Sequence, residues 1–369
     1  MPTNIDKFSD IRPYNDQEIQ PAIKRVINSE EFMDAILSFR FPKLSKCLGF
    51  VLKPLLRRYF LYKWGSIDSI DKMQKVVGVY MQHMIDSTTT KFTYSGLEKL
   101  DPEKNYLFVS NHRDIAMDPS FVNWALFSEN FHTVRIAIGD NLLSKPFVSD
   151  LMRMNKSFIV KRSVTGVREM MKSLSTLSDY ISTSLKSDSS IWIAQKEGRA
   201  KDGFDKTDPA IIKMFYVNGK KQKIPFDEYI KSLNIVPVAV SYELDPCDQQ
   251  KARELYELSE SGEYNKSQFE DIESIVSGIV GQKGHVHVAF GQPLSGHFEN
   301  ADQVAEEVDK QIYQNYFLHP SNLIAAQQDV DNLSAQDIAA FKARIQAIPP
   351  ELQETVLKMY ANPVGHFTS

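Results

Sequence analysis

A histidine with two aspartates close behind it is the part of the sequence best suited to chemistry. His112 is followed by Asp114 and Asp118 within the stretch SNHRDIAMDPSF, residues 110–121. An imidazole titrates near neutral pH and can take up and return a proton, but it needs a carboxylate or carbonyl oxygen to fix its tautomer. Either aspartate is close enough in sequence to serve. The alternative is a polar loop in which an aspartate caps the next helix.

The elements on either side of this stretch predict that it lies at the edge of a β-sheet. The apolar run YLFV, residues 106–109, comes before it, and an apolar pattern of helical period begins at Phe121. In open α/β sheets, reacting groups gather at the carboxyl ends of the strands. We therefore expect His112 in a turn that leads from a strand into a helix.

Short β-rich runs recur along the middle of the chain, with longer helical patterns between most of them. The predicted strands are residues 92–96, 106–110, 134–139, 157–161, 191–194, 234–242 and 285–290. The most extended helical patterns between them are residues 118–130, 164–187 and 249–283. This alternation predicts an α/β domain with a mixed, mostly parallel sheet flanked by helices.

A helical region is expected on each side of this domain. Residues 19–39 and 72–85 carry apolar residues at three- and four-residue spacing. We therefore expect an N-terminal helical region over residues 1–88, the α/β domain over residues 89–318 and a helical C-terminal tail over residues 319–369.

One segment of the N-terminal region has a composition of its own. Residues 41–65 are apolar and aromatic but are interrupted by basic residues, namely Lys43, Lys46, Lys53, Arg57, Arg58 and Lys63. Such a mixture is typical of a helix that lies in a lipid headgroup layer. The alternative is a helix that packs on the core with its lysines in water.

The composition excludes several classes of protein. The 369 residues are 42% hydrophobic and 24% charged, which is ordinary for a globular protein. A net charge of −4 gives no reason to expect nucleic-acid binding. Cys47 and Cys247 have no metal-ligand spacing, which favours a reducing compartment. The chain has neither a secretory signal pattern nor an uncharged apolar run of about 18 residues, so we expect an intracellular protein, soluble or bound at a membrane surface.

Other catalytic patterns do not fit. His-Arg-Asp at residues 112–114 begins like a protein-kinase catalytic loop, but Pro119 stands where that loop needs asparagine. The sequence has no G-x-S-x-G turn, which argues against an α/β-hydrolase. His285 and His287 alternate on a predicted strand without a third ligand nearby, so we expect no metal site.

Several segments taken in order resemble the glycerolipid acyltransferases, which acylate glycerol-3-phosphate, lysophosphatidate and related lysolipids. They are Asn111-His112 with Asp118, residues 138–163 ending near Lys161-Arg162, IWIAQKEGRAKDG at 191–203, NIVPVAVSY at 234–242 with Pro237, and HVHVAFGQPL at 285–294. Their order and spacing match together over roughly residues 90–318. The resemblance implies an acyltransferase domain over residues 89–318.

Two positions differ from the pattern of that family. The family places its aspartate five residues after the histidine, where this chain has Met117, and Asp118 comes one residue later. The family's threonine is missing from the third segment, so Gly198 is followed directly by Arg199. We interpret the first difference as a longer turn that still brings Asp118 to the imidazole, with Asp114 as the substitute.

The resemblance also implies the roles of the site residues. His112 with Asp118 or Asp114 is the predicted catalytic pair. The predicted residues for the acceptor's phosphate are Arg199, Glu197, Gly198, Arg162 and Lys161. Backbone N–H groups at the start of the following helix are candidates to stabilise the tetrahedral oxyanion. No metal or bound cofactor is expected, since acyl-CoA or acyl carrier protein enters as a co-substrate.

The sequence therefore predicts an O-acyltransferase of phospholipid synthesis, which moves a fatty acyl group to lysophosphatidate or glycerol-3-phosphate. The expected location is the cytoplasm, peripheral on the cytoplasmic face of a membrane. One alternative is a catalytically silent lipid-binding protein of the same fold, favoured by the shifted aspartate and the missing threonine. Another is an acyl thioesterase. The acceptor, the donor carrier, the chain length, the oligomeric state and the role of the tail stay open.

Overall fold

The fold is that of a computed structural model, which describes residues 6–41, 43, 45–143, 145–187, 189–267, 270–328 and 330–366. Residues 1–5, 42 and 44 of the predicted N-terminal region lie outside this set, as do the side chain of Lys46 and residues 329 and 367–369 of the predicted tail. The chain divides into two compact units. The first comprises Met1–Tyr80 and Arg135–Thr176, and the second comprises Met81–Val134 and Leu177–Ser369.

The first unit is mainly helical. It contains α1 (Asp16–Asn28), α2 (Glu30–Arg40), α3 (Ser45–Trp64), the first part of α4 (Ile70–Thr88), β3 (Arg135–Gly139), α6 (Pro146–Met154), β4 (Ser157–Val160) and the first part of α7 (Val167–Lys186). The strands β3 and β4 pair in parallel. Ile23, Phe32, Phe60 and Met154 belong to the buried apolar cluster that joins its helices.

The pattern predicted as one helix over residues 19–39 is two helices in the structure. Ser29 lies between α1 and α2, and its side chain accepts a hydrogen bond from the Phe32 amide at 3.2 Å. A serine at this position satisfies a free N–H at the start of a helix. The local capping chemistry therefore divides an apolar pattern that continues across the break.

The second unit contains a five-stranded part of the sheet. Its strands are β1 (Thr89–Ser95), β2 (Leu107–Ser110), β5 (Ile191–Ala194), β6 (Ile235–Tyr242) and β7 (Gly284–Phe290), in the order β1-β7-β6-β2-β5. Neighbouring strands in this unit are parallel except β6 and β7, which are antiparallel. The predicted class, a mixed and mostly parallel α/β fold with helical regions at both ends of the chain, is confirmed.

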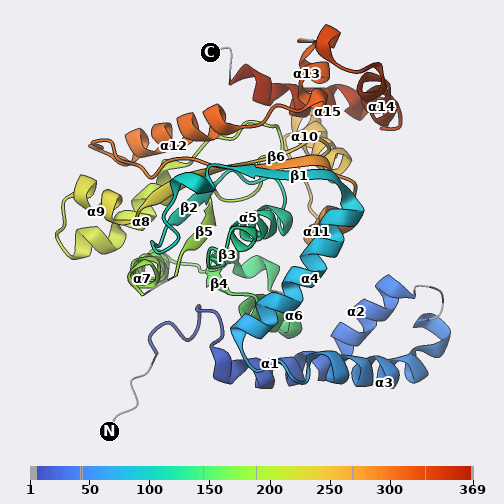
Figure 1. The fold of residues 1–369 in the computed structure, drawn as a ribbon, viewed down its shortest axis with the longest axis vertical. Coiled ribbons are helices and arrows are strands. Elements are labelled where there is room, and N and C mark those ends of the chain that lie inside the picture. The colour runs from blue at the N-terminus through green and yellow to red at the C-terminus, as the bar shows by residue number, and fades with distance from the viewer. Residues whose placement is uncertain are drawn as a thin grey trace. The chain divides into compact units, whose positions relative to one another are not determined.

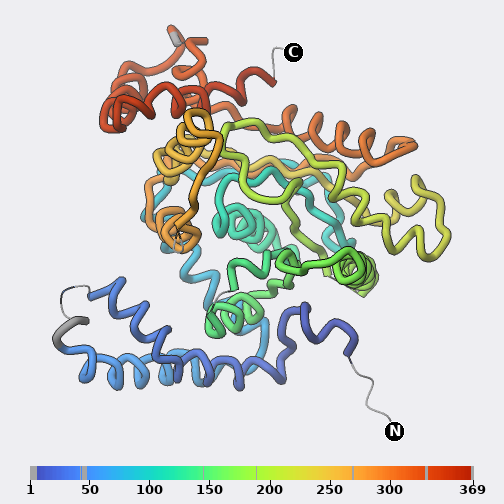
Figure 2. Tube along the Cα trace, turned by 180° about the vertical axis from the view of Figure 1, so that it is seen from behind, coloured from blue at the N-terminus to red at the C-terminus, as the bar shows by residue number. Residues whose placement is uncertain are grey.

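Helices cover this sheet and extend beyond it. They are α5 (Met117–Ser128), α8 (Pro209–Lys221), α9 (Phe226–Ser232), α10 (Asp248–Ser261), α11 (Glu270–Val280), α12 (Ala301–Asn315), α13 (Pro320–Ala326), α14 (Ala335–Gln346) and α15 (Pro350–Gly365), together with the second parts of α4 and α7. Within this unit, α12 packs on β6 and α5 contacts β7 from the other side of the sheet (Figure 1). The tail helices α13 and α14 pack on α15, which in turn packs on α10 (Figure 2).

The predicted helical pattern over residues 249–283 is also two helices. Gly262, with φ of 75°, ends α10 in the left-handed conformation that glycine adopts without strain. Every residue of β6 is buried, as its apolar sequence IVPVAVSY predicts for a central strand. Among the described residues, none of the helices combines the length and apolar character needed to cross a bilayer.

Candidate active site

The turn between β2 and α5 carries His112 and is held in place by Asn111. The buried Asn111 side chain accepts a hydrogen bond from the Val240 amide at 2.7 Å and donates to the Val240 carbonyl at 3.0 Å. It also donates to Asp205 at 3.1 Å. A side-chain amide that bonds both backbone groups of a neighbouring strand replaces the ladder at the point where β2 stops. The turn is therefore fixed to β6.

His112 and Asp118 form the predicted pair. The Nδ1 atom of His112 lies 2.8 Å from Oδ2 of Asp118, which is fully buried in the first turn of α5. The His112 side chain keeps 14% of its surface exposed, and its Nε2 atom makes no hydrogen bond with any described residue. Because a carboxylate accepts the Nδ1 proton, the neutral ring presents the Nε2 lone pair outward. This is the tautomer that a general base needs.

The Asp118 carboxylate has further partners that hold it as an acceptor. Its Oδ2 atom accepts hydrogen bonds from the backbone amides of Arg113, at 2.6 Å, and Asp114, at 2.9 Å. Its Oδ1 atom accepts from the hydroxyl of Tyr242 at 2.6 Å. These hydrogen bonds limit the rotation of the buried carboxylate. The extra residue in this turn therefore still brings the aspartate to the imidazole.

Asp114 has a different position. Its Oδ1 atom accepts hydrogen bonds from the amides of Ala116, at 3.0 Å, and Met117, at 2.9 Å, so it caps the start of α5. Burial, followed by the nearby charge of Asp118, raises the pKa of the Asp114 carboxyl above its usual range. Of the two candidates, only Asp118 contacts His112, and the catalytic role of the pair stays a prediction.

The helix-start amides named as oxyanion candidates are already in use. Four amides, those of Arg113, Asp114, Ala116 and Met117, donate to the two aspartate carboxylates. They therefore do not point at a substrate oxygen, and the expectation that they do is not supported by the geometry. The Ile115 amide makes no hydrogen bond in the described part of the chain, so it is a free donor of this turn.

The loop after β5 lies against the His112 turn. The Ala200 amide donates to the His112 carbonyl at 2.8 Å, and the Gln195 amide donates to the Ser110 carbonyl at 2.8 Å. The ring of Trp192, on β5, meets the His112 imidazole edge-on with centroids 5.7 Å apart. The strand order places β2 beside β5, so the first and third predicted segments come together.

Three of the predicted phosphate-binding residues lie on this loop. Gly198 has φ of 77° and faces open space where a side chain would be. Arg199 is half-buried, and its Nη2 atom donates to Ser274 Oγ of α11 at 3.4 Å. Its Nη1 atom is buried and has no hydrogen-bond partner in the described part of the chain. Glu197 is exposed beside them.

The other predicted cations have separate surroundings. Lys161 and Arg162 follow β4 in the first unit, where Lys161 Nζ lies 3.6 Å from an Asp10 carboxylate oxygen and the Arg162 amide donates to Asp140 at 3.0 Å. Their part in binding an acceptor stays a prediction. Lys201, which could add a further cation beside Arg199, forms an ion pair with Glu254 of α10.

Two supporting groups were missed from the sequence. Tyr242 reaches Asp118 from β6, and burial followed by the neighbouring carboxylate raises the pKa of its hydroxyl well above the ordinary value. Arg113 is bound by the buried carboxylate of Asp205, with its Nη2 atom 2.6 Å from Oδ2. Each of these partners is more than 90 residues away along the chain. No local spacing could have revealed either contact.

His285 and His287 do face the same side of β7. Both imidazoles lie within hydrogen-bond distance of the Thr93 hydroxyl, at 2.6 and 2.7 Å. The rings of Phe317 and the buried His319 cover them, so they do not simply face solvent. In the described residues, no three histidine, cysteine, aspartate or glutamate side chains are arranged to hold a metal ion.

A family model described as Acyltransferase matches residues 91–240. The resemblance predicted from the sequence is confirmed over this part of the chain, which matches the acyltransferase family. It contains the His112 turn, the Arg199 loop and most of β6.

Among solved structures, the chain is similar to the 1-acyl-sn-glycerophosphate (LPA) acyltransferase PlsC from Thermotoga maritima. The identity is 12%, the TM-score is 0.37, and the match covers 81% of this chain and 94% of that one. A comparison with curated proteins finds no match. The assignment therefore rests on the family model and on the geometry of the site.

Proposed function

We propose that this protein transfers a fatty acyl group from an acyl thioester to a hydroxyl of a glycerophosphate-type acceptor, with His112 as the general base. The observation that carries the proposal is the His112 Nδ1 to Asp118 Oδ2 contact of 2.8 Å. It leaves Nε2 at an accessible edge of the sheet, with no hydrogen-bond partner in the part of the chain that the structure describes. Asp118 then stabilises the imidazolium ion that forms during the reaction.

The proposed step needs only the chain and its two substrates. The acceptor hydroxyl gives its proton to Nε2 of His112 while its oxygen bonds to the thioester carbonyl carbon. The tetrahedral intermediate collapses with cleavage of the carbon–sulfur bond. The thiolate leaves with the proton from Nε2, so His112 is neutral again. No metal or bound cofactor takes part in this step as we propose it.

Arg199 is the proposed contact for the acceptor's phosphate. Its Nη1 atom has no hydrogen-bond partner among the described residues. An unpaired buried guanidinium nitrogen is costly unless a ligand supplies the acceptor atom. Guanidinium groups bind phosphate oxygens in a bidentate manner. The open space beside Gly198 lets a ligand approach the backbone. Glu197, Lys161 and Arg162 remain the further residues that we propose for this site.

An exposed apolar face of α11 suits contact with the hydrocarbon region in which a lipid acceptor lies. The helix that holds Arg199 through Ser274 is α11, whose opposite face exposes Ile272, Val276 and Ile279 at helical spacing. An apolar helix face in contact with water is unfavourable unless an apolar partner covers it. We therefore place lysophosphatidate before glycerol-3-phosphate as the acceptor to test. The donor, acyl-CoA or acyl carrier protein, is left to the same experiment.

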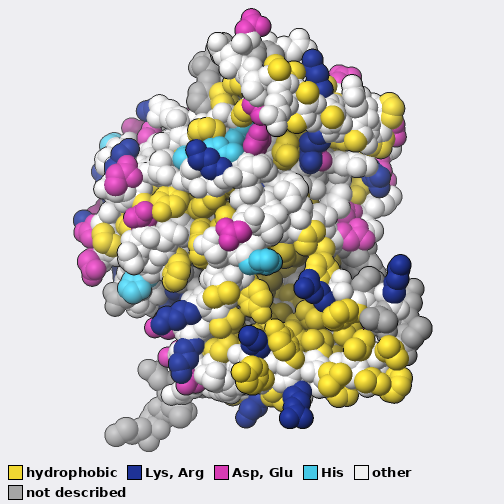
Figure 3. Space-filling model, turned by 45° about the vertical axis from the view of Figure 1, so that its right-hand side comes forward, with side chains coloured by type: hydrophobic (Ala, Val, Ile, Leu, Met, Phe, Trp, Pro, Cys, Tyr) yellow, Lys and Arg dark blue, Asp and Glu magenta, His cyan; other side chains and the backbone are white. Residues whose placement is uncertain are grey.

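We further propose that the enzyme works on a membrane surface, peripheral on the cytoplasmic face. The outward side of α3 exposes aromatic and aliphatic residues, including Phe50 at 78% and Tyr62 at 83% exposed. Figure 3 shows hydrophobic side chains gathered at the lower right, with Lys and Arg side chains around them. Aromatic residues bordered by basic ones suit a lipid headgroup layer that carries anionic lipids.

The test of this proposal is the release of free CoA from palmitoyl-CoA with lysophosphatidate, with glycerol-3-phosphate and without acceptor. Release that depends on an acceptor, together with formation of the acylated product, supports the transferase and identifies its acceptor. Equal release without any acceptor would instead show a thioesterase. Arg199→Ala should raise the KM for the phosphate acceptor at least tenfold and leave the KM for palmitoyl-CoA within about twofold, the loss expected for a charged hydrogen bond.

A further inference from the structure

A buried lysine holds the backbone next to the catalytic histidine. Lys251 lies on α10 with only 2% of its side chain exposed. Its Nζ atom donates to the carbonyl oxygen of Arg113, the residue after His112, at 2.6 Å. It also forms an ion pair with the Asp245 carboxylate. An ammonium group is costly to bury without such partners, so its place in the fold is set by these two contacts.

Asp245 in turn is held by the C-terminal helices. Its amide donates to the hydroxyl of Tyr360, on α15, at 2.8 Å. Its carbonyl oxygen accepts a hydrogen bond from Arg344, on α14, at 2.9 Å. Burial raises the pKa of the Asp245 carboxyl, but the Lys251 charge and its hydrogen bonds outweigh burial and lower the pKa below its usual range. The lysine contact is therefore an ion pair in the folded protein.

Asp248 is a second aspartate that binds the same two tail residues, Tyr360 and Arg344. Tyr360 donates its hydroxyl proton to Asp248 Oδ2 at 3.0 Å, and Arg344 Nε donates to the same oxygen at 2.8 Å. The Tyr360 hydroxyl thus accepts from one residue of the β6–α10 segment and donates to another. Two helices of the tail, α14 and α15, therefore bind the segment that carries Lys251.

A second set of contacts joins the tail to the same turn. Arg113 donates to the Gly203 carbonyl at 3.2 Å, and Asn362 of α15 donates to the Asp202 carbonyl at 2.6 Å. The Cα of Gly203 lies so close to the Met359 carbonyl that an added Cβ would come within 2.4 Å of its oxygen. The loop that binds the Arg113 side chain is therefore packed directly on α15.

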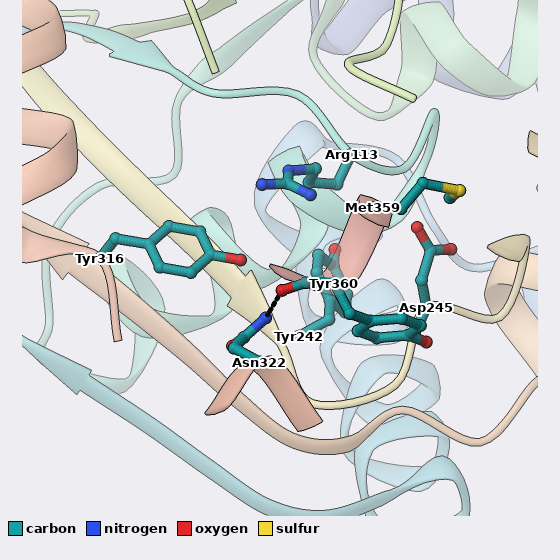
Figure 4. A pocket seen from close by; sticks show the side chains of 7 residues that line it. All are labelled: Arg113, Tyr242, Asp245, Tyr316, Asn322, Met359 and Tyr360. Carbon is teal, nitrogen blue, oxygen red and sulfur yellow. Dashed lines mark hydrogen bonds between the residues drawn. The ribbon is translucent and has the colours of Figure 1, made fainter. Parts of the chain in front are cut away.

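A small polar cavity lies where these contacts meet (Figure 4). Its volume is about 20 Å³, and it is lined by Arg113, Tyr242, Asp245, Tyr316, Asn322, Met359 and Tyr360. The lining therefore combines the catalytic turn, the strand that holds Asp118 and the C-terminal helices. The space is too small for a substrate, so we interpret these side chains as structural contacts between the turn, the strand and the tail helices.

We propose that Lys251 and Tyr360 are positioning residues of the acyl-transfer site, through which the C-terminal helices fix the turn that carries His112. The proposal rests on the function proposed above, in which His112 is the base. Neither residue reaches the reacting atoms. Lys251 acts on the backbone carbonyl beside His112, and Tyr360 acts on the segment that pairs with Lys251.

The test uses a double variant without either charge to separate the effect of Lys251 on catalysis from its effect on stability. Lys251→Met alone leaves the Asp245 carboxylate buried and unpaired, so it lowers stability as well as activity. The double variant Lys251→Met/Asp245→Asn removes both charges, should regain much of the lost melting temperature, and still lacks the bond to the Arg113 carbonyl. We expect its kcat to stay about 10- to 100-fold below the wild-type value, with both KM values within about twofold, because a shift of about 1 Å in a catalytic group has effects of this size. A double variant that melts like the wild type and has wild-type kcat would overturn the proposal.

A second readout does not depend on the reaction. The His112 Nδ1 proton bonded to Asp118 should give a downfield proton resonance in the wild type that is missing in His112→Ala. We expect it to broaden or disappear in the double variant. If acyl transfer fails in every assay, this resonance still tests the positioning. A resonance that is unchanged in the double variant, or missing from the wild type, would overturn the proposal.

Tyr360→Phe tests the contribution of the tail with a matched control. The control is Tyr106→Phe, since Tyr106 is also buried and its hydroxyl also accepts from a loop amide, that of Asp101 at 2.9 Å. Tyr106 precedes β2 at the end of the strand remote from His112. Tyr360→Phe should lose more stability, because its hydroxyl also donates to the Asp248 carboxylate. At a temperature where both variants are folded, only Tyr360→Phe should lower kcat, by about threefold or more. An equal kcat in the two variants would overturn the role of Tyr360.

Discussion

Asp114 and Asp118 show how two aspartates in one short turn take different tasks. Asp118 bonds the imidazole and the Tyr242 hydroxyl, whereas Asp114 caps α5. The sequence predicted both roles but could not assign them, because the assignment depends on the path of a turn with one extra residue. His112 could be predicted because the residue type and the strand before it are local features. Tyr242 and Lys251 could not be predicted, since only the folded sheet and α10 bring them to the turn.

The two aspartates should respond differently to substitution. Asp118→Asn removes the charge that stabilises the imidazolium ion and can favour the wrong tautomer, so we expect kcat to fall by about 10²- to 10⁴-fold. Asp114→Ala removes the cap and should lower the free energy of unfolding by about 1 kcal/mol. Steady-state kinetics measures kcat of both variants, and urea unfolding measures their free energies of unfolding. A larger loss of kcat in Asp114→Ala, measured where that variant is folded, would reverse the assignment.

At the scale of single elements, helix α3 has one side packed in the core and one side exposed. Its inward side packs Phe60 into the core and pairs Lys53 and Arg57 with Glu30 of α2. These two basic residues are therefore bound within the first unit, and the outward face is mainly apolar. The sequence predicted the core helix and the membrane-surface helix as alternatives. The inward side packs in the core, and the membrane-surface role of the outward face stays a proposal. The division of the patterns over residues 19–39 and 249–283 was missed, because single capping residues ended helices within continuous apolar patterns.

The outward face of α3 should bind lipid. Phe50→Asp/Tyr62→Asp places two charges on this exposed face, where they should leave folding unchanged. We expect at least a fivefold loss of binding to vesicles that contain anionic lipid, measured by sedimentation.

A matched control is Leu258→Asp, an exposed apolar residue of α10. It should sediment with vesicles like the wild type. Unchanged vesicle binding of the α3 double variant would contradict the membrane-surface role of this helix.

At the scale of the whole molecule, segments far apart in the chain meet on the second unit. The tail helices line a cavity together with Arg113 of the His112 turn. His319, at the start of α13, packs against His285 of β7. The strand runs and their order along the chain were enough to predict the fold class. They did not predict the role of the tail, because its helical pattern looks the same whether it caps the domain or binds a partner. The buried polar contacts of Arg344 and Tyr360 show that the tail helices pack on the β6–α10 segment.

The histidine cluster predicts a pH dependence of stability. Burial lowers the pKa of His287 to about 4 and that of His319 to about 3, and it also lowers the pKa of His285. The folded protein therefore keeps these rings neutral, while the unfolded chain binds protons at an ordinary histidine pKa of about 6.5. The unfolded state gains protons as the pH falls from about 6.5 to 4, so the free energy of unfolding should decrease across this window.

Urea unfolding at pH 7 and pH 5 measures this effect. His287→Gln/His319→Gln should lose less stability than the wild type between the two pH values, because glutamine does not titrate. Carboxylates that titrate in the same range contribute equally to both proteins. The difference between the two slopes of unfolding free energy against pH therefore reports the two histidines. Equal slopes would contradict the neutral, buried state of these two histidines.

The central claim is that His112 is the base that moves an acyl group to a glycerophosphate hydroxyl. The most direct measurement is the conversion of lysophosphatidate and palmitoyl-CoA to phosphatidate by the purified protein and by His112→Ala, with the product identified by mass spectrometry. We predict phosphatidate formation by the wild type and a loss of at least 10²-fold in the variant, which should keep its fold and its vesicle binding. Phosphatidate formation at the same rate by both proteins would contradict the account.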